Sequence, residues 1–234
     1  MKIVGVIPAR YHSTRFPGKV LATIAGKPMI QHVYENSLSA NLSRLLIATD
    51  DPRVAAVAES FGAEVVMTSP EHRSGTERIA EVAKKVEADA FVNIQGDEPL
   101  IHPEIINKVV RELEQGEEMV SVFTIIKPEE AESPDVVKVI LDREGYALYF
   151  SRSPIPFGAE FYLKHIGIYG YTRTCLLNFV SYPFSYLEKW ERLEQLRALF
   201  NGIKIKMVET KRKLVAVDRP EDIKKVEEFL KNGN

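Results

Sequence analysis

The feature that most constrains the fold is an alternation, in the first half of the chain, of short β-branched runs with longer amphipathic stretches. Several of the longer stretches begin with proline, which suits the first turn of a helix because the N–H it lacks has no helical partner there. Strand and helix in alternation predict an α/β fold with a mainly parallel sheet. The predicted strands are residues 2–7, 44–48, 64–67, 90–94 and 119–124, and the predicted helices are residues 28–38, 52–61, 76–86 and 103–115. Such sheets bind ligands at the carboxyl ends of their strands, so we expect the chemistry in the loops that follow them.

The pattern changes after about residue 136. Residues 136–141 and 146–150 flank the sequence DREG, which is typical of a β-hairpin. Further strands are predicted at residues 164–169 and 203–208, and further helices at residues 172–180, 191–200 and 220–230. No repeat or low-complexity linker separates the two halves. We therefore predict one α/β domain over residues 1–234, in which residues 136–171 form a lobe on the same sheet.

Composition excludes several classes of protein. The 31 Lys and Arg residues nearly balance the 33 Asp and Glu residues, which leaves no basic field for nucleic acid. The single cysteine, Cys175, excludes an internal disulfide framework and fits a reducing compartment. No apolar stretch is long enough to span a bilayer, and the first residues lack the pattern of a signal peptide. We expect a soluble, cytoplasmic protein that binds neither nucleic acid nor membrane.

The loop after the first predicted strand carries three cations, Arg10, Arg15 and Lys19. Backbone N–H groups in such a loop can form a concavity for an anion, and three cations would neutralise a polyphosphate. The spacing is not that of a Walker A loop. A solvated basic linker is the alternative, but the position at the carboxyl end of a strand favours phosphate binding.

A second candidate loop, residues 73–78, opens a predicted helix. Ser74 or Thr76 can cap this helix, and Glu77 lies near the positive end of its dipole. These residues alone leave two interpretations open. One is an ordinary capped helix, and the other is a helix N-terminus that binds a nucleotide.

The clearest signal is the loop QGDEP at residues 95–99. Gly96 permits a tight turn after the strand, and Asp97 then stands at the carboxyl end of the sheet. A carboxylate opposite a phosphate-binding loop suits Mg²⁺, which takes one or two protein oxygens and completes its shell with phosphate and water. The alternative is a turn that caps the next helix. From the residues alone, we interpret the polar residues of the second half as structural, Asp218 as the start of a helix included.

In combination the motifs resemble the CMP-Kdo synthetase family, the 3-deoxy-manno-octulosonate cytidylyltransferases. The resemblance covers essentially the whole chain. It implies a Rossmann-like α/β fold of the glycosyltransferase-A type, as in nucleotide-diphospho-sugar transferases, with a small antiparallel lobe for sugar binding and dimerisation. It also implies a homodimer that transfers the cytidylyl group of CTP to Kdo for lipopolysaccharide biosynthesis. The segments that carry the resemblance are residues 7–19 (IPARYHSTRFPGK), 26–33 (GKPMIQHV), 74–78 (SGTER), 92–99 (VNIQGDEP), 136–156 (VVKVILDREGYALYFSRSPIP), 165–171 (HIGIYGY), 193–197 (LEQLR) and 217–222 (VDRPED).

The resemblance further implies roles for individual residues. Asp97 and Asp218 match the Mg²⁺ ligands, and Arg10 and Lys19 match catalytic positions that bind the phosphates of CTP. The residues that match positions near cytidine and its ribose are Ala9, Arg73, Ser74 and Gly75. The residues that fall where the family holds the sugar acid are Arg15, Gln95, Arg152, His165, Tyr169, Glu194 and Gln195.

The reaction implied is a displacement in which a hydroxyl of Kdo attacks the α-phosphorus of CTP and pyrophosphate leaves. Two alternatives stay open. One is a cytidylyltransferase for another sugar acid, such as sialic acid or an 8-amino analogue of Kdo, and the other is a non-catalytic nucleotide-binding regulator. The chain departs from the family pattern in two segments. Residues 157–163 form a shorter connection, and residues 211–217 replace a glycine-rich approach to Asp218.

Overall fold

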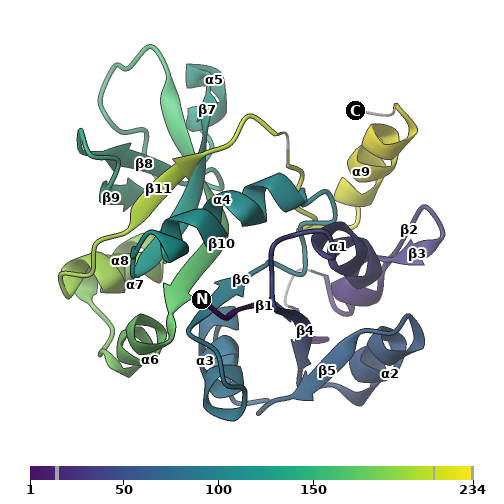
Figure 1. The fold of residues 1–234 in the computed structure, drawn as a ribbon. Coiled ribbons are helices and arrows are strands. Elements are labelled where there is room, and N and C mark those ends of the chain that lie inside the picture. Colours follow the sequence, from purple (N-terminus) through teal and green to yellow (C-terminus); the bar gives the residue numbers. More distant parts are fainter. Residues whose placement is uncertain (14–15, 213, 233–234) are drawn as a thin grey trace. The chain divides into compact units, whose positions relative to one another are not determined.

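The computed structural model describes residues 1–13, 16–212 and 214–232. The chain divides into two compact units, whose elements are labelled in Figure 1. The first unit comprises Met1–Asn107 and Arg212–Asn234, and the second comprises Lys108–Lys211. The predicted lobe of residues 136–171 lies within the second unit. That the whole chain behaves as one domain stays a prediction.

The first unit is built on four parallel strands, which confirms the predicted parallel sheet. Their order is β5 (Glu64–Met67), β4 (Arg44–Thr49), β1 (Ile3–Pro8) and β6 (Ala90–Asn93). The residues of β6 and all but the last of β1 are buried, as expected for central strands of a parallel sheet that is covered on both faces. The helices that connect the strands are α1 (Met29–Ser37), α2 (Pro52–Ser60) and α3 (Gly75–Lys85).

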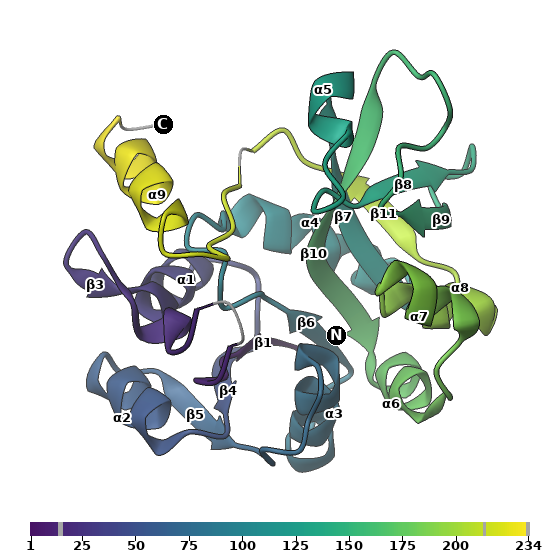
Figure 2. The same cartoon turned by 180° about the vertical axis from the view of Figure 1, so that it is seen from behind.

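The end of the chain returns to the first unit through α9 (Asp222–Lys231). In both views α9 lies beside the hairpin of β2 (Thr23–Ile24) and β3 (Lys27–Pro28), which the sequence had not predicted (Figures 1 and 2). Val217 and Val226 join this hairpin and α1 in one buried apolar cluster. The packing of Val217 fixes the position of its neighbour Asp218.

The second unit is centred on β7 (Met119–Ile126), which pairs antiparallel with β10 (Tyr162–Thr172) and parallel with β11 (Lys206–Glu209). The predicted hairpin is confirmed as the antiparallel pair of β8 (Lys138–Leu141) and β9 (Ala147–Ser151). The second unit therefore carries the smaller antiparallel part of the fold.

The helix predicted over residues 191–200 is wrong, because the chain forms two helices there. Arg192 has a φ of 56°, a left-handed conformation that ends the first of them. Figure 2 shows the two, α7 (Tyr186–Glu191) and α8 (Gln195–Phe200), side by side. The other helices are the 3-10 turn η1 (Lys19–Leu21), α4 (Pro103–Glu114), α5 (Pro128–Ala131) and α6 (Arg173–Ser181).

Candidate active site

Two of the candidate loops pack against the carboxyl end of β1 at Pro8. A Cβ atom on Gly96 would lie 2.9 Å from the carbonyl oxygen of Pro8, and one on Gly75 would lie 3.1 Å from Pro8 Cγ. Both distances are below ordinary van der Waals contact, so glycine allows the two loops to approach β1 closely. The loop after β6 and the start of α3 thus meet at the end of the first strand.

A cleft that is partly open to solvent lies among these loops. Ala9 does not line it, since its side chain is buried and its N–H donates to the carbonyl oxygen of Ala48 over 2.8 Å. The predicted site residues that line the cleft are Arg10, Lys19, Arg73, Ser74, Gly75, Gln95 and Asp97. Residues that the sequence had not singled out also line it, namely Pro8, Val20, His72 and Arg78.

Lys19 brings the two predicted carboxylates to one point. Its Nζ donates to Asp97 Oδ2 over 2.6 Å and to the carbonyl oxygen of Val217 over 3.2 Å, and it lies 3.5 Å from Asp218 Oδ1. The N–H of Val217 also donates to the carbonyl oxygen of Asp97 over 2.9 Å. Residues far apart in the sequence therefore meet around a single cation.

Asp218 precedes the last helix and is not its N-cap, which is Glu221. The carboxylate of Asp222 accepts from the N–H groups of Asp218 and Arg219, over 3.2 and 3.0 Å. The side chain of Asp218 is directed at Lys19 instead. Its position fits a ligand-binding carboxylate.

The pair of Asp97 and Asp218 fits the donor set expected for Mg²⁺. Two carboxylates that reach the same ammonium can reach one divalent cation, and Mg²⁺ prefers few protein oxygens together with phosphate and water. Within the described residues, no group of three or more His, Cys, Asp or Glu side chains is placed to hold a metal ion. A metal here would depend on the substrate for the rest of its shell.

The start of α3 is a capped helix N-terminus that also lines the cleft. Ser74 caps the helix, because its hydroxyl accepts from the N–H of Glu77 over 3.2 Å, and Glu77 in turn accepts from the N–H of Arg73 over 2.7 Å. Ser74 and Arg73 also line the cleft. The cap thus holds two cleft residues in place at the positive end of the helix dipole.

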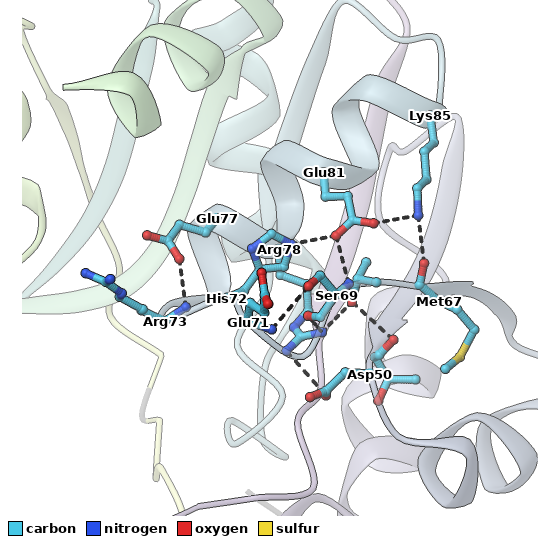
Figure 3. Close-up of polar contacts among 12 residues, drawn as sticks. Asp50, Met67, Ser69, Glu71, His72, Arg73, Glu77, Arg78, Glu81 and Lys85 are labelled. Carbon is cyan, nitrogen blue, oxygen red and sulfur yellow. Dashed lines mark hydrogen bonds and ion pairs between the residues drawn. The ribbon is translucent and has the colours of Figure 1, made fainter. Parts of the chain in front are cut away.

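A polar network adjoins the cleft, and Figure 3 shows its side chains. Arg78 is buried and reaches Asp50 after β4, with 3.3 Å between Nη2 and Oδ1, as well as the hydroxyl of Thr68. Burial lowers the pKa of Arg78, and the charge of Asp50 opposes that effect. The network ties the first turn of α3 to the ends of β4 and β5. Arg78 belongs to the motif SGTER, but nothing in the sequence indicated that Asp50 would be the partner of Arg78.

His72 is held by the same helix. Its Nε2 lies 2.5 Å from a carboxylate oxygen of Glu81, whose other oxygen accepts from Lys85 over 2.6 Å. Burial raises the pKa of Glu81, but hydrogen bonds from Lys85, the Ser69 N–H and His72 outweigh burial and lower it to about 2. Glu81 is therefore ionised at neutral pH and orients His72 beside the cleft.

The loop after β1 is braced by a cation–π stack. The guanidinium of Arg53 lies 3.5 Å from the ring centroid of Tyr11, and Arg53 also pairs with Asp51 over 2.6 Å. Hydrogen bonds from Arg53 lower the pKa of Asp51 to about 2. The backbone carbonyl oxygen of Tyr11 accepts from the N–H of Gly18, whose φ is 71°. This turn presents Lys19 to the carboxylates.

In the second unit, a bulge in β10 brings two predicted sugar-binding residues together. The pairing with β7 jumps from Ile166 opposite Val122 to Tyr169 opposite Ser121. The rings of His165 and Tyr169 consequently lie 5.3 Å apart between centroids. Residues four apart in a regular strand would be separated by roughly 13 Å.

Both of these residues are neutral at neutral pH. Burial lowers the pKa of His165 to about 3. Burial, with a smaller contribution from Glu194, raises the pKa of Tyr169 well above its usual value. Glu194 immediately precedes α8, and Gln195, the first residue of α8, is buried.

Arg152 is engaged with backbone carbonyl groups. Its guanidinium donates to the carbonyl oxygens of Glu191 over 2.8 Å and Pro134 over 2.9 Å. The carboxylate of Glu191 accepts from Ser151 and from the N–H of Arg152, over 2.7 and 2.8 Å. Arg152 thus holds the end of β9 against the end of α7, and its role toward a sugar acid stays a prediction.

The predicted site residues are distributed over both units. Arg15 lies outside the described residues. The phosphate, cytidine and metal positions, together with Gln95, belong to the first unit. The second unit holds Arg152, His165, Tyr169, Glu194 and Gln195.

The fold and the cleft are those of a nucleotide-binding α/β protein, with cations and a carboxylate pair at the carboxyl ends of parallel strands. Within the residues described, no helix combines the length and apolar character needed to cross a membrane. The model of the cytidylyltransferase family matches residues 4–205.

Relatives match the chain over nearly its full length. The 3-deoxy-manno-octulosonate cytidylyltransferase of Trichlorobacter lovleyi is 49% identical, with 100% of each chain covered. That of Solibacter usitatus is 52% identical, with 98% of this chain and 95% of the relative covered. The chain therefore belongs to the cytidylyltransferase family, among the 3-deoxy-manno-octulosonate cytidylyltransferases.

Solved structures agree with this assignment. A CMP:2-keto-3-deoxy-manno-octonic acid synthetase complexed with CTP has a TM-score of 0.96 and is 42% identical, with 100% of both chains covered. A cytidylyltransferase from Leptospira borgpetersenii, 17% identical with a TM-score of 0.70, covers 100% of this chain and 88% of its own and shares the fold. The predicted nucleotidyltransferase fold is confirmed.

Proposed function

We propose that this enzyme transfers the cytidylyl group of CTP to 3-deoxy-manno-octulosonate (Kdo), giving CMP-Kdo and pyrophosphate. The observation that carries the proposal is the meeting of Asp97 and Asp218 at Lys19, beside a cleft that Lys19, Asp97 and Arg10 line. A phosphoryl transfer needs this combination of positive charge and acidic ligands, because the reaction is catalysed mainly by positioning and charge neutralisation.

The cationic and the acidic residues of the site have different roles in the reaction. Arg10 and Lys19 neutralise the triphosphate and then the departing pyrophosphate. A hydroxyl of Kdo attacks the α-phosphorus, the new P–O bond forms, and the bond to the β-phosphate oxygen breaks. Asp97 and Asp218 would hold Mg²⁺, which supplies Lewis-acid stabilisation of the phosphate charge when bound.

The loop of Arg73, Ser74 and Gly75, which lines the cleft, forms the proposed cytidine site. Backbone and short polar groups of this loop pair with the exocyclic amino group of cytosine, and uracil would leave those groups unmatched. The cap of α3 and the buried Arg78 support the proposal, because together they make this part of the cleft rigid. CTP is therefore the expected nucleotide.

The decisive experiment measures pyrophosphate release from CTP and Mg²⁺ with Kdo, an 8-amino analogue of Kdo or sialic acid. Release with Kdo at the highest kcat/KM supports the proposal. Preference for another sugar acid would reassign the substrate, and CTP binding without release from any of them would indicate a non-catalytic binder. The proposal includes a cytoplasmic homodimer, as the full-length resemblance implies, and light scattering of the purified protein tests the dimer.

A further inference from the structure

Ser121 on β7 has no part in the function described so far, yet it lies opposite the bulge of β10. It is completely buried. Its Oγ lies 2.9 Å from the carbonyl oxygen of Ile168, 3.4 Å from that of Ile166 and 2.9 Å from His165 Nε2. One hydroxyl thus contacts both the backbone of the bulge and the ring beside it.

The hydroxyl has one proton to donate, and these contacts determine where it goes. The carbonyl of Ile168 has no proton, so two oxygens 2.9 Å apart would repel each other unless the hydroxyl donates to that carbonyl. The contact between Ser121 and His165 Nε2 must then be donated by the ring. His165 is therefore protonated at Nε2.

The state of the other ring nitrogen follows. Burial keeps the His165 ring neutral at neutral pH, so a proton on Nε2 leaves Nδ1 with a free lone pair. Within the described part of the chain, Ser121 is the only hydrogen-bond partner of the ring. Phe150 and Tyr169 pack on it, with centroid distances of 5.0 and 5.3 Å. Their contacts fix the plane of the ring, and Ser121 fixes its protonation.

We propose that Ser121 is a positioning residue that holds His165 in the Nε2–H tautomer, so that Nδ1 accepts a hydrogen bond from a hydroxyl group of the sugar acid. A lone pair repels a carboxylate, so this histidine recognises a hydroxyl and not the acid group. The identity of the ligand rests on the proposed function, whereas the tautomer follows from the contacts in β7 and β10 alone.

The first test reads the tautomer directly. A long-range proton–nitrogen correlation spectrum of the ¹⁵N-histidine-labelled protein at neutral pH identifies the ring signals of His165 by their absence in His165→Gln. We expect the Nε2–H pattern in the unmodified protein and a loss of that pattern in Ser121→Ala. Ser181→Ala is the control, because Ser181 is exposed and its hydroxyl donates only locally, to the carbonyl of Asn178 over 2.7 Å. An Nδ1–H pattern in the unmodified protein, or an unchanged pattern in Ser121→Ala, would overturn the proposal.

The second test separates the substrates. Ser121→Ala should raise the KM for Kdo by about tenfold while the KM for CTP stays within about twofold, the size expected for one misoriented hydrogen bond. If the alanine variant does not fold, Ser121→Cys fills the site with a somewhat larger thiol that is only a weak donor, and it should show the same split in smaller degree. Equal changes for both substrates would refute the role in sugar binding. If the unmodified enzyme releases no pyrophosphate with Kdo, the proposed function fails, while the spectrum still decides the tautomer.

Discussion

Replacing Lys19 with methionine removes the ammonium that lies between the carboxylates of Asp97 and Asp218. The two carboxylate oxygens are no more than about 6 Å apart, because they lie 2.6 and 3.5 Å from the same Nζ. Two negative charges at this separation repel by roughly 0.7 kcal/mol in a dielectric like water and roughly 2.7 kcal/mol at an effective dielectric constant near 20. The side chains of Lys19 and Asp97 are 14% and 28% exposed, but that of Asp218 is 46% exposed, so the repulsion lies between these limits, at about 1–2 kcal/mol.

Lys19→Met should therefore lose about 1–2 kcal/mol of stability without divalent metal, or roughly 2–8 °C in Tm for a chain of this size. Mg²⁺ should restore much of the loss, because a divalent cation between the carboxylates replaces the missing positive charge. Thermal unfolding in EDTA and in excess Mg²⁺ measures both effects without any turnover. The metal-induced rise in Tm should be clearly larger for the variant than for the unmodified protein.

Lys27→Met is the matched control. Lys27 pairs with Glu35 over 2.7 Å, but both side chains are well exposed, at 47% and 39%. Lys27→Met should lower the free energy of unfolding by less than about 1 kcal/mol, and Mg²⁺ should not change this difference. The carboxylate pair is not a single cation site if Lys19→Met has the Tm of the unmodified protein. The same conclusion follows if Mg²⁺ raises the Tm of Lys19→Met and the Tm of the unmodified protein by the same amount.

Three further substitutions test other parts of the structure. Asp218→Asn should reduce kcat by roughly a hundredfold in the pyrophosphate assay while Tm changes little, since Asp218 is not the N-cap of the last helix; normal turnover would remove Asp218 from the site. Gly96→Ala should lower stability by about 1–3 kcal/mol in denaturant unfolding, because its Cβ would press on the carbonyl of Pro8, and an unchanged midpoint would contradict that contact. The pKa of His165 is about 3 in the folded protein, against about 6.5 in the unfolded chain. As pH falls from about 6.5 towards 3, the unfolded chain therefore binds a proton at this histidine, whereas the folded protein does not bind one. Relative to His165→Gln, the unmodified protein should therefore lose up to about 1.4 kcal/mol per pH unit across that window, and a constant difference would show that the ring is not buried in its neutral form.

The parallel part of the fold could be predicted because its signals are local. Strands β1, β4, β5 and β6 are short apolar runs, and each boundary lies within two residues of the prediction. The break between α7 and α8 could not be predicted in this way. It falls on Arg192, in a left-handed conformation for which the sequence offers neither glycine nor asparagine.

The convergence of the loops that line the cleft was predictable for the same reason. Loops that follow parallel strands share one edge of the sheet, so Lys19, Ser74 and Asp97 had to converge. Asp218 is different, because nothing local distinguishes it from the acidic start of a helix. Only the resemblance to a family pointed to it, and only the packing of Val217 explains its place beside Asp97.

The contact between His165 and Tyr169, two of the predicted sugar-binding residues, depends on a β-bulge that the periodicity of the sequence does not reveal. An alternating strand would point His165 and Tyr169 to the same face but keep them roughly 13 Å apart, too far to form one contact surface. The bulge at Gly167 and Ile168 removes that separation, and the buried hydroxyl of Ser121 holds the carbonyl of Ile168 in place. From the sequence alone, a serine in a buried strand is interpreted as an ordinary core residue. Its effect on the chemistry of a neighbouring strand becomes apparent only when the register of the two strands is known.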